Sequence, residues 1–145
     1  MVRMSKAITA NYYLEASWYA YAVLEDRLIA ILSASGGAHE KNKPSRIMRN
    51  FGRKLDVIDQ RRIRDSLLAV YFSDSLMTGL RNWKNERNDL MHAMADASVP
   101  LTDIDRLAHL LAIDGRNHVK EVCRATRLLK RNRTRIAIPT KPVPY

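Results

Sequence analysis

The chain of 145 residues lacks the features that mark secreted and membrane proteins. It has one cysteine, Cys123, which cannot form an internal disulfide and which falls in a helical pattern typical of a small core residue. The apolar run Ala16–Leu24 is too short for a membrane span or a signal peptide, and Glu25 follows it directly. We therefore expect a cytoplasmic protein that has no membrane partner.

Motifs of several enzyme classes are also missing. The sequence contains no glycine-rich phosphate loop, no Ser-His-Asp set and no zinc-finger spacing. His109, Asp114 and His118 carry side chains that can bind a metal, but their spacing matches no pair of histidines on one helix face. We expect no metal site and no cofactor.

Positive charge, in contrast, is abundant. The chain has 25 Lys and Arg against 15 Asp and Glu, a formal charge of +10 that favours nucleic acid over anionic membrane or an acidic protein as partner. Arg46, Arg49, Arg53 and Lys54 lie on one face of an expected helix, and a second basic run covers Arg127–Arg135. Two alternatives stay open for each group: it binds along a phosphate backbone, or it forms a solvated surface. In the second alternative, the run Arg127–Arg135 places cations favourably near a helix C-terminus.

The first expected helix covers about Asn11 to Ser33, and Gly36 and Gly37 end it. Its apolar residues are spread widely enough to contact more than one neighbouring helix. Its aromatic residues, expected in the core or a dimer interface rather than stacked on RNA bases, are Tyr12, Tyr13, Trp18, Tyr19 and Tyr21.

A loop at residues 38–43 and a second helix follow. Pro44 suits the first turn of this helix, and Asp59 can begin a third. Whether the third helix breaks near Ser73 or continues into the next apolar stripe stays open. The residues expected to face inward are Ile47, Met48, Phe51, Leu55 and Ile58, then Ile63, Leu67, Leu68, Tyr71 and Phe72.

The last two helical segments complete the expected fold. Thr102 suits the N-cap of the final helix, and Gly115 could kink it. From residue 131 onward, basic residues and three prolines predict an extended arm or a disordered tail. The residues expected to face inward are Leu76, Leu80, Trp83, Leu90, Met94 and Ala97, then Leu107, Leu110, Leu111, Val119, Val122, Leu128 and Leu129.

Strand-like alternation is weak throughout, Arg135–Ile138 being the one candidate, and there is no repeat of fixed period. The sequence therefore predicts an all-α fold, a four- to five-helix up-and-down bundle. We expect a single helical domain over residues 1–133 and an extended C-terminal tail over residues 134–145.

Arg87 interrupts one apolar stripe, between Trp83 and Leu90. A guanidinium keeps its charge in a protein, so that burying it without a partner would cost several kcal/mol. Two partners remain open: a phosphate that enters a groove between helices or subunits, or a carboxylate of the bundle such as Glu25 or Asp26.

The residues R-N-D-L-M-H, Arg87–His92, resemble the R-x4-H signature of the HEPN superfamily of small all-helical proteins. Many of these are metal-independent endoribonucleases in toxin, abortive-infection and CRISPR-associated systems. Asn88 meets the family's preference for a polar residue after the arginine, and the resemblance covers the bundle plan of residues 10–130. Met94 stands where some HEPN toxins carry a tyrosine that a partner antitoxin modifies, so that mode of regulation is not expected.

The resemblance implies a homodimer in which two copies of this helix line one composite site. RNA would be cleaved by attack of a ribose 2′-hydroxyl, with Arg87 stabilising the phosphoryl charge, His92 moving a proton and Asn88 orienting His92 or contacting phosphate. Lys84 is expected to bind RNA beside them, and an antitoxin protein is a candidate partner. The alternative for the chain is a non-catalytic helical module that binds RNA or a protein, with His92 merely an exposed or capping residue.

Overall fold

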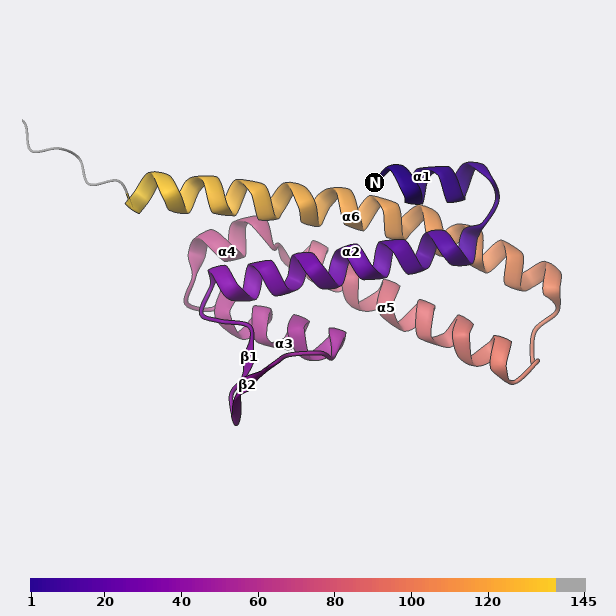
Figure 1. Ribbon diagram of the computed structural model, residues 1–145, viewed down its shortest axis with the longest axis horizontal. Coiled ribbons are helices and arrows are strands. Elements are labelled where there is room, and N and C mark those ends of the chain that lie inside the picture. Colours follow the sequence, from indigo (N-terminus) through magenta and orange to yellow (C-terminus); the bar gives the residue numbers. More distant parts are fainter. Residues whose placement is uncertain (138–145) are drawn as a thin grey trace, which may run out of the picture.

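Six helices and one short hairpin make up residues 1–137, the part of the chain that this computed structural model describes, with side chains described to residue 134 (Figure 1). The all-α prediction is confirmed, although these residues hold six helices rather than four or five. The elements are α1 (Val2–Thr9), α2 (Tyr13–Ala34), β1 (His39–Glu40), β2 (Lys43–Ile47), α3 (Phe51–Arg62), α4 (Ser66–Tyr71), α5 (Asp74–Ala95) and α6 (Leu101–Ala137).

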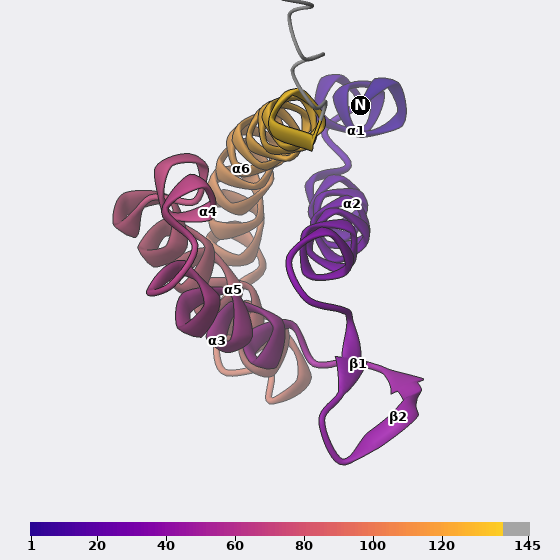
Figure 2. The same cartoon turned by 90° about the vertical axis from the view of Figure 1, so that its left-hand side faces the viewer.

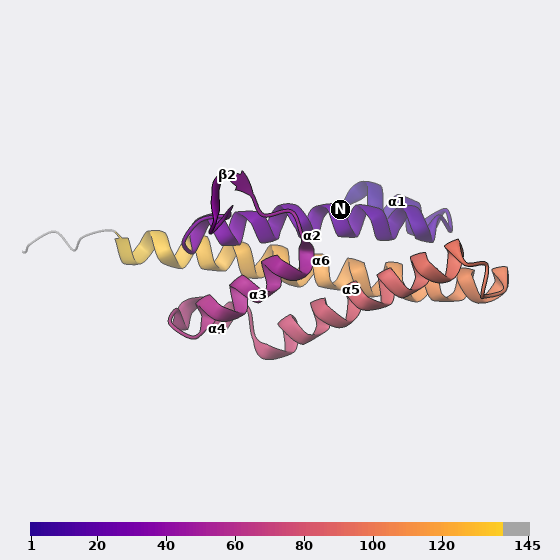
Figure 3. The same ribbon diagram turned by 90° about the horizontal axis from the view of Figure 1, so that it is seen from below.

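The long helices α2, α5 and α6 form the frame of the bundle. In the end-on view of Figure 2, α6, α2 and the group of α3, α4 and α5 stand on three sides of the core, and the hairpin projects away from α6. Seen from below in Figure 3, α5 and α6 run antiparallel and join at one end of the molecule. Helix α1, which the sequence patterns did not predict, folds back along α2 and buries Met4 and Ala7.

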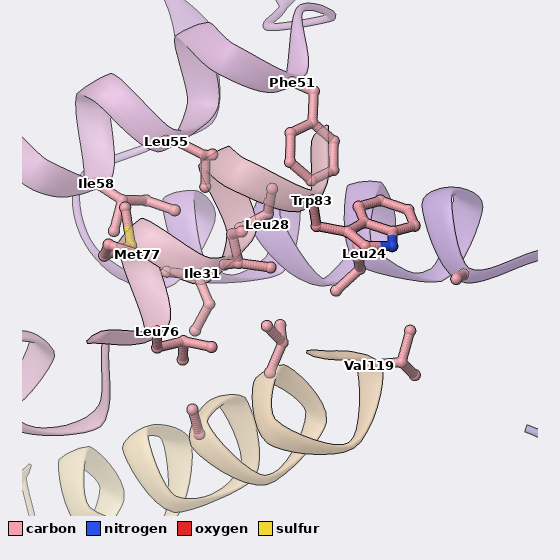
Figure 4. Close-up of a cluster of buried hydrophobic side chains, with 14 of the residues drawn as sticks. Leu24, Leu28, Ile31, Phe51, Leu55, Ile58, Leu76, Met77, Trp83 and Val119 are labelled. Atoms are coloured by element: carbon pink, nitrogen blue, oxygen red, sulfur yellow. The ribbon is translucent and has the colours of Figure 1, made fainter. Parts of the chain in front are cut away.

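The core consists mainly of Leu and Ala side chains, with a few Met, Ile, Val and aromatic residues, on helices that include α2, α3, α5 and α6 (Figure 4). Trp83 is the largest buried side chain, and its Nε1 donates a hydrogen bond to the carbonyl of Leu111 at 2.9 Å. Helix α6 continues through Gly115, where a Cβ atom would lie 2.9 Å from both Ala20 and Trp83. Glycine at this position therefore lets α2, α5 and α6 approach closely.

The hairpin replaces the predicted start of the second helix. Pro44 lies in β2, which pairs antiparallel with β1, and Ile47 is exposed. Helix α3 begins only at Phe51, because the Asn50 side chain accepts the backbone N–H of Arg53 at 2.9 Å and caps it. The prediction of a helix from Pro44 was wrong, since a two-stranded edge tolerates a proline as well as a first helical turn does.

The boundaries between α3, α4 and α5 also differ from the prediction. Asp59 lies inside α3 instead of starting a helix, and Ile63, expected to face inward, is 83% exposed in the following turn. Asp65 caps α4 by accepting the Leu68 N–H, and Ser73 caps α5 by accepting the Leu76 N–H. The chain therefore does break near Ser73.

The final helix is longer than predicted at both ends. It begins at Leu101, with Thr102 inside it, and runs to Ala137. An extended arm or disordered tail was expected from residue 131, and an extended tail from residue 134. For the residues up to 137 these predictions were wrong, because these residues are helical. Arg133 holds this end against the bundle through hydrogen bonds to Asp65 and to the carbonyl of Ala34. The strand-like reading of Arg135–Ile138 was wrong over residues 135–137, and residues 138–145 lie outside the described part. Besides Ile47 and Ile63, four residues expected to face inward are exposed, namely Met94, Ala97, Leu107 and Leu110.

Candidate functional site

Helix α5 carries the candidate catalytic residues. Its buried stripe, Leu76, Leu80, Trp83 and Leu90, packs into the core as the sequence predicts. Arg87 lies on this stripe and is half-buried, with its side chain turned toward α2.

The Arg87 guanidinium lies over the ring of Tyr21 on α2, with 4.1 Å between its central carbon and the ring centroid. Tyr21 in turn stacks on Phe51 at the start of α3, with centroids 5.2 Å apart and planes inclined at 26°. The Nε of Arg87 is buried and has no hydrogen-bond partner among the described residues.

Neither of the two carboxylates considered as partners of Arg87 pairs with it. Glu25 accepts a hydrogen bond from the Lys54 ammonium at 2.7 Å, and Asp26 pairs with its neighbour Arg27 at 2.6 Å. Among the residues with described side chains, Arg87 forms no ion pair within 4.0 Å. Among the described residues, its recorded contact is therefore an aromatic face rather than a carboxylate.

Lys54 was predicted on an exposed basic face together with the arginines, and that prediction was wrong. Its side chain is only 1% exposed, because Glu25 reaches it from α2 and the carbonyl of Arg49 accepts a second hydrogen bond at 3.3 Å. A buried ammonium requires such partners, and the sequence separation of 29 residues hides them from a local pattern.

Electrostatics at Tyr21 reflect the same arrangement. Burial raises the pKa of the Tyr21 hydroxyl above its ordinary value of 10.0, and the negative charge of Glu25 raises it further. The nearby positive charge of Arg87 lowers this pKa in part. Tyr21 is thus held neutral between a carboxylate and a guanidinium that do not pair with each other.

Lys84 lies one helical turn before Arg87 and reaches the start of α3. A Cβ atom on Gly52 would lie 3.4 Å from the Lys84 ammonium and 3.3 Å from the Asn50 side-chain oxygen. The first turn of a helix carries partial positive charge, so that a lysine beside it concentrates positive potential. Arg53, exposed on the same turn, adds a further cation.

The other two predicted RNA-binding residues, Arg46 and Arg49, line a groove of about 530 Å³ between the hairpin, α2 and α3. Buried Lys54 and its partly exposed partner Glu25 form part of its lining. The structure therefore divides the predicted RNA-binding residues between two neighbouring places at the start of α3: Arg46 and Arg49 in this groove, Arg53 and Lys84 beside Gly52.

His92 and Asn88 do not converge with Arg87 within one chain. Both are exposed, and no described side chain bonds to either. At about 100° per residue, His92 points about 140° around the helix from Arg87. A site that uses both side chains needs a second surface to bring them together.

A different groove lies on the other side of α5, where it faces α6. It measures about 500 Å³ and combines leucine side chains with three carboxylates. No Lys or Arg stands among the lining residues, so this groove of a basic protein is acidic and unsuited to phosphate. The sequence signal for it, acidic residues beside exposed leucines at helical spacing, was missed. The lining residues are Glu86, Asp89, Leu90, Ala93, Leu107, Leu110, Leu111 and Asp114.

His109 and His118 pack against other helices. His109 packs on Tyr13 with ring centroids 4.6 Å apart, and burial lowers the pKa of His118 below its ordinary 6.5 despite three nearby carboxylates. Within residues 1–137, no three His, Cys, Asp or Glu side chains are grouped so as to hold a metal ion. No helix in that range has the length and apolar character to cross a membrane.

Comparison with models of protein families, with curated proteins and with solved structures found no match to this chain.

Proposed function

We propose that this chain is a metal-independent endoribonuclease of the HEPN type that acts as a homodimer. One observation carries the proposal: Arg87 is held in a half-buried position over Tyr21 with no carboxylate to balance it. A permanent cation kept in place without an internal counter-ion suits an anion that arrives from outside, and a phosphodiester is such an anion.

The chemistry that fits is transesterification within RNA. The 2′-hydroxyl oxygen attacks the adjacent phosphorus while the bond to the 5′-oxygen of the next nucleotide breaks, leaving a 2′,3′-cyclic phosphate and a 5′-hydroxyl. Arg87 and Lys84 would stabilise the negative charge that grows on the phosphoryl oxygens. His92 would take the proton from the 2′-hydroxyl or return one to the leaving oxygen, with Asn88 placing it.

A homodimer supplies the geometry that one chain lacks. Because Arg87 and His92 point in different directions on α5, a two-fold axis beside this helix would bring the histidine of one copy toward the arginine of the other. A protein partner that covers the site, such as an antitoxin in a toxin or phage-defence pair, fits the same proposal.

Cleavage of a structured RNA in the presence of a chelator tests the proposal. Wild type should release 2′,3′-cyclic phosphate ends, and His92→Ala should lose at least about 100-fold in rate, the usual scale for a general acid or base. His39→Ala, which removes an exposed histidine of the hairpin, should cleave at the wild-type rate. Intact RNA with wild type, or equal rates for wild type and His92→Ala, would contradict the enzyme.

The second candidate is a module that binds RNA without cutting it. It is favoured by the groove that holds Arg46 and Arg49, and by the absence of any described contact that orients His92. In the same experiment this protein would retain RNA in a filter-binding assay, leave it intact, and lose affinity on Arg46→Gln with Arg49→Gln.

A further inference from the structure

Four cations form a straight exposed row along α6. Lys120, Arg124, Arg127 and Arg131 follow one another at steps of four, three and four residues, which places them on one face of the helix. The row is about 16 Å long, and none of its members forms an ion pair with a described side chain. We call these four residues the α6 row.

The helix dipole does not account for the α6 row. Cations stabilise a helix at its C-terminus, but the effect is limited to the last turn. Because α6 continues to Ala137, Arg131 lies more than one turn before its end, and Lys120 lies about 25 Å before it. These positions gain nothing from the dipole.

Helix stability does not account for it either. Like charges four residues apart destabilise a helix by about 0.2–0.5 kcal/mol per pair. Between Gly115 and Thr134 the single acidic residue is Glu121, which lies about a quarter turn away from the row. The row therefore costs helix stability, which points to a partner that supplies the missing negative charge.

An anionic membrane is a poor partner for this surface. A helix that lies in a membrane interface needs an apolar face that can enter the lipid. The apolar face of α6, which includes Val119, Val122 and Leu129, is buried in the core against the bundle. From Asn117 to Thr134 the exposed positions of α6 hold five cations, one carboxylate and two small polar residues, a surface suited to phosphates.

We propose that the α6 row binds the sugar–phosphate backbone of RNA. One strand of a duplex carries a phosphate about every 3.4 Å, so that a row of this length faces about five of them. The hairpin, beside the groove that holds Arg46 and Arg49, projects from the side of the molecule opposite α6 (Figure 2). The row is therefore a second RNA-binding surface. Its binding of RNA does not depend on whether the chain cleaves RNA.

The test uses a 24-nucleotide RNA with 2′-O-methyl groups, which cannot be cleaved by 2′-hydroxyl attack. Its affinity is measured against salt concentration for wild type and for Lys120→Gln/Arg124→Gln/Arg127→Gln/Arg131→Gln, since glutamine preserves helix propensity. The control, Arg3→Gln/Lys6→Gln/Arg64→Gln/Arg106→Gln, removes the same charge from exposed positions on other surfaces. Circular dichroism checks that both variants fold.

For single strands, each phosphate contact contributes about 0.7 to the salt slope. The row variant should therefore lose about 3 from the slope of wild type, and between 50 and 200 mM salt wild type should lose about fifty-fold more affinity than the variant. The salt slope of the control variant should fall by less than about 1. Equal slopes for row variant and control, or binding of wild type to phosphatidylserine vesicles but not to the RNA, would overturn the proposal.

Cleavage separates this proposal from the proposed enzyme. The row variant should cleave a dinucleotide at the wild-type rate, because a dinucleotide is too short to reach both surfaces. If wild type leaves RNA intact while the row variant loses its slope, the enzyme proposal fails and the RNA-binding row stands.

Discussion

Lys54 and Arg87 are two cations that reach the same segment of α2 from neighbouring helices, and they differ in what meets them. The Lys54 ammonium is almost completely buried, 2.7 Å from Glu25 and within hydrogen-bonding distance of a backbone carbonyl. Arg87 lies over the ring of Tyr21, four residues before Glu25, and its Nε has no described partner. The bundle balances the charge of Lys54 and leaves that of Arg87 open.

The difference separates a structural cation from a functional one. A fully buried charge must find its partner within the fold, because no solvent or ligand can reach it. A half-buried charge leaves part of its surface accessible to a ligand. The guanidinium is suited to this since it is weakly hydrated and binds phosphate through two parallel hydrogen bonds. Variants that disturb the Lys54–Glu25 pair should therefore lower the free energy of unfolding, and variants of Arg87 should lower activity.

The largest effect on stability is expected from Glu25→Ala. The variant leaves the Lys54 ammonium buried without a carboxylate, and the free energy of unfolding should fall by about 3–5 kcal/mol in urea denaturation. Asp26→Ala is the matched control on the same helix, because Asp26 is 66% exposed and pairs with its neighbour. That control should change the free energy by less than about 1 kcal/mol. Similar losses for both variants would show that Glu25 does not stabilise Lys54.

Replacing both members of the pair should restore most of this loss. In Glu25→Leu/Lys54→Met no charge stays buried, and apolar replacements of similar volume are often neutral or stabilising. The free energy of unfolding should return to within about 1–2 kcal/mol of wild type. If the double variant is as unstable as Glu25→Ala, packing around the pair matters more than its charge.

Arg87→Met should change stability much less than Glu25→Ala. The variant gives up one cation–π contact, worth about 0.5–1 kcal/mol, and removes a buried Nε that has no described partner. Urea denaturation should show a change of no more than about 1 kcal/mol. A loss as large as that of Glu25→Ala would mean that Arg87 is structural.

The smallest expected effect concerns Tyr21 at high pH. Its pKa is raised in the folded protein, so the stability that its neutral form provides is complete below pH 10.0 and is lost as the pH rises through the folded pKa. Tyr21→Phe cannot ionise and should lose less stability than wild type as the pH rises above 10.0. Identical curves for the two proteins would show that Tyr21 does not titrate with folding.

Local patterns of the sequence predicted the long helices well. The periodicity of α2 and α5 located both, and Gly36 and Gly37 were correctly read as the end of the first, where their φ values of 133° and 100° suit only glycine. The place of Arg87 on a buried stripe was also clear from spacing alone. These features depend on neighbours in sequence, which is the information that a periodic pattern contains.

Features that depend on distant neighbours were not predictable in this way. Lys54 is buried because Glu25 reaches it from 29 residues earlier, and Pro44 lies in a strand because β1 pairs with it. Tyr21 was grouped with the aromatic residues expected in the core or a dimer interface, and its contact with Arg87 joins two helices that the pattern could not place side by side. The helical end of α6 depends similarly on the contact between Arg133 and Asp65.

The role of Arg87 is best tested by the rate at which Arg87→Met cleaves RNA in a chelator, measured together with the free energy of unfolding of the variant. We expect a rate at least about 100-fold below wild type, the usual cost of removing a group that stabilises transition-state charge, with stability changed by no more than about 1 kcal/mol. A variant that cleaves within threefold of the wild-type rate, or that loses activity only because it unfolds, would show that Arg87 does not bind the phosphate of the substrate.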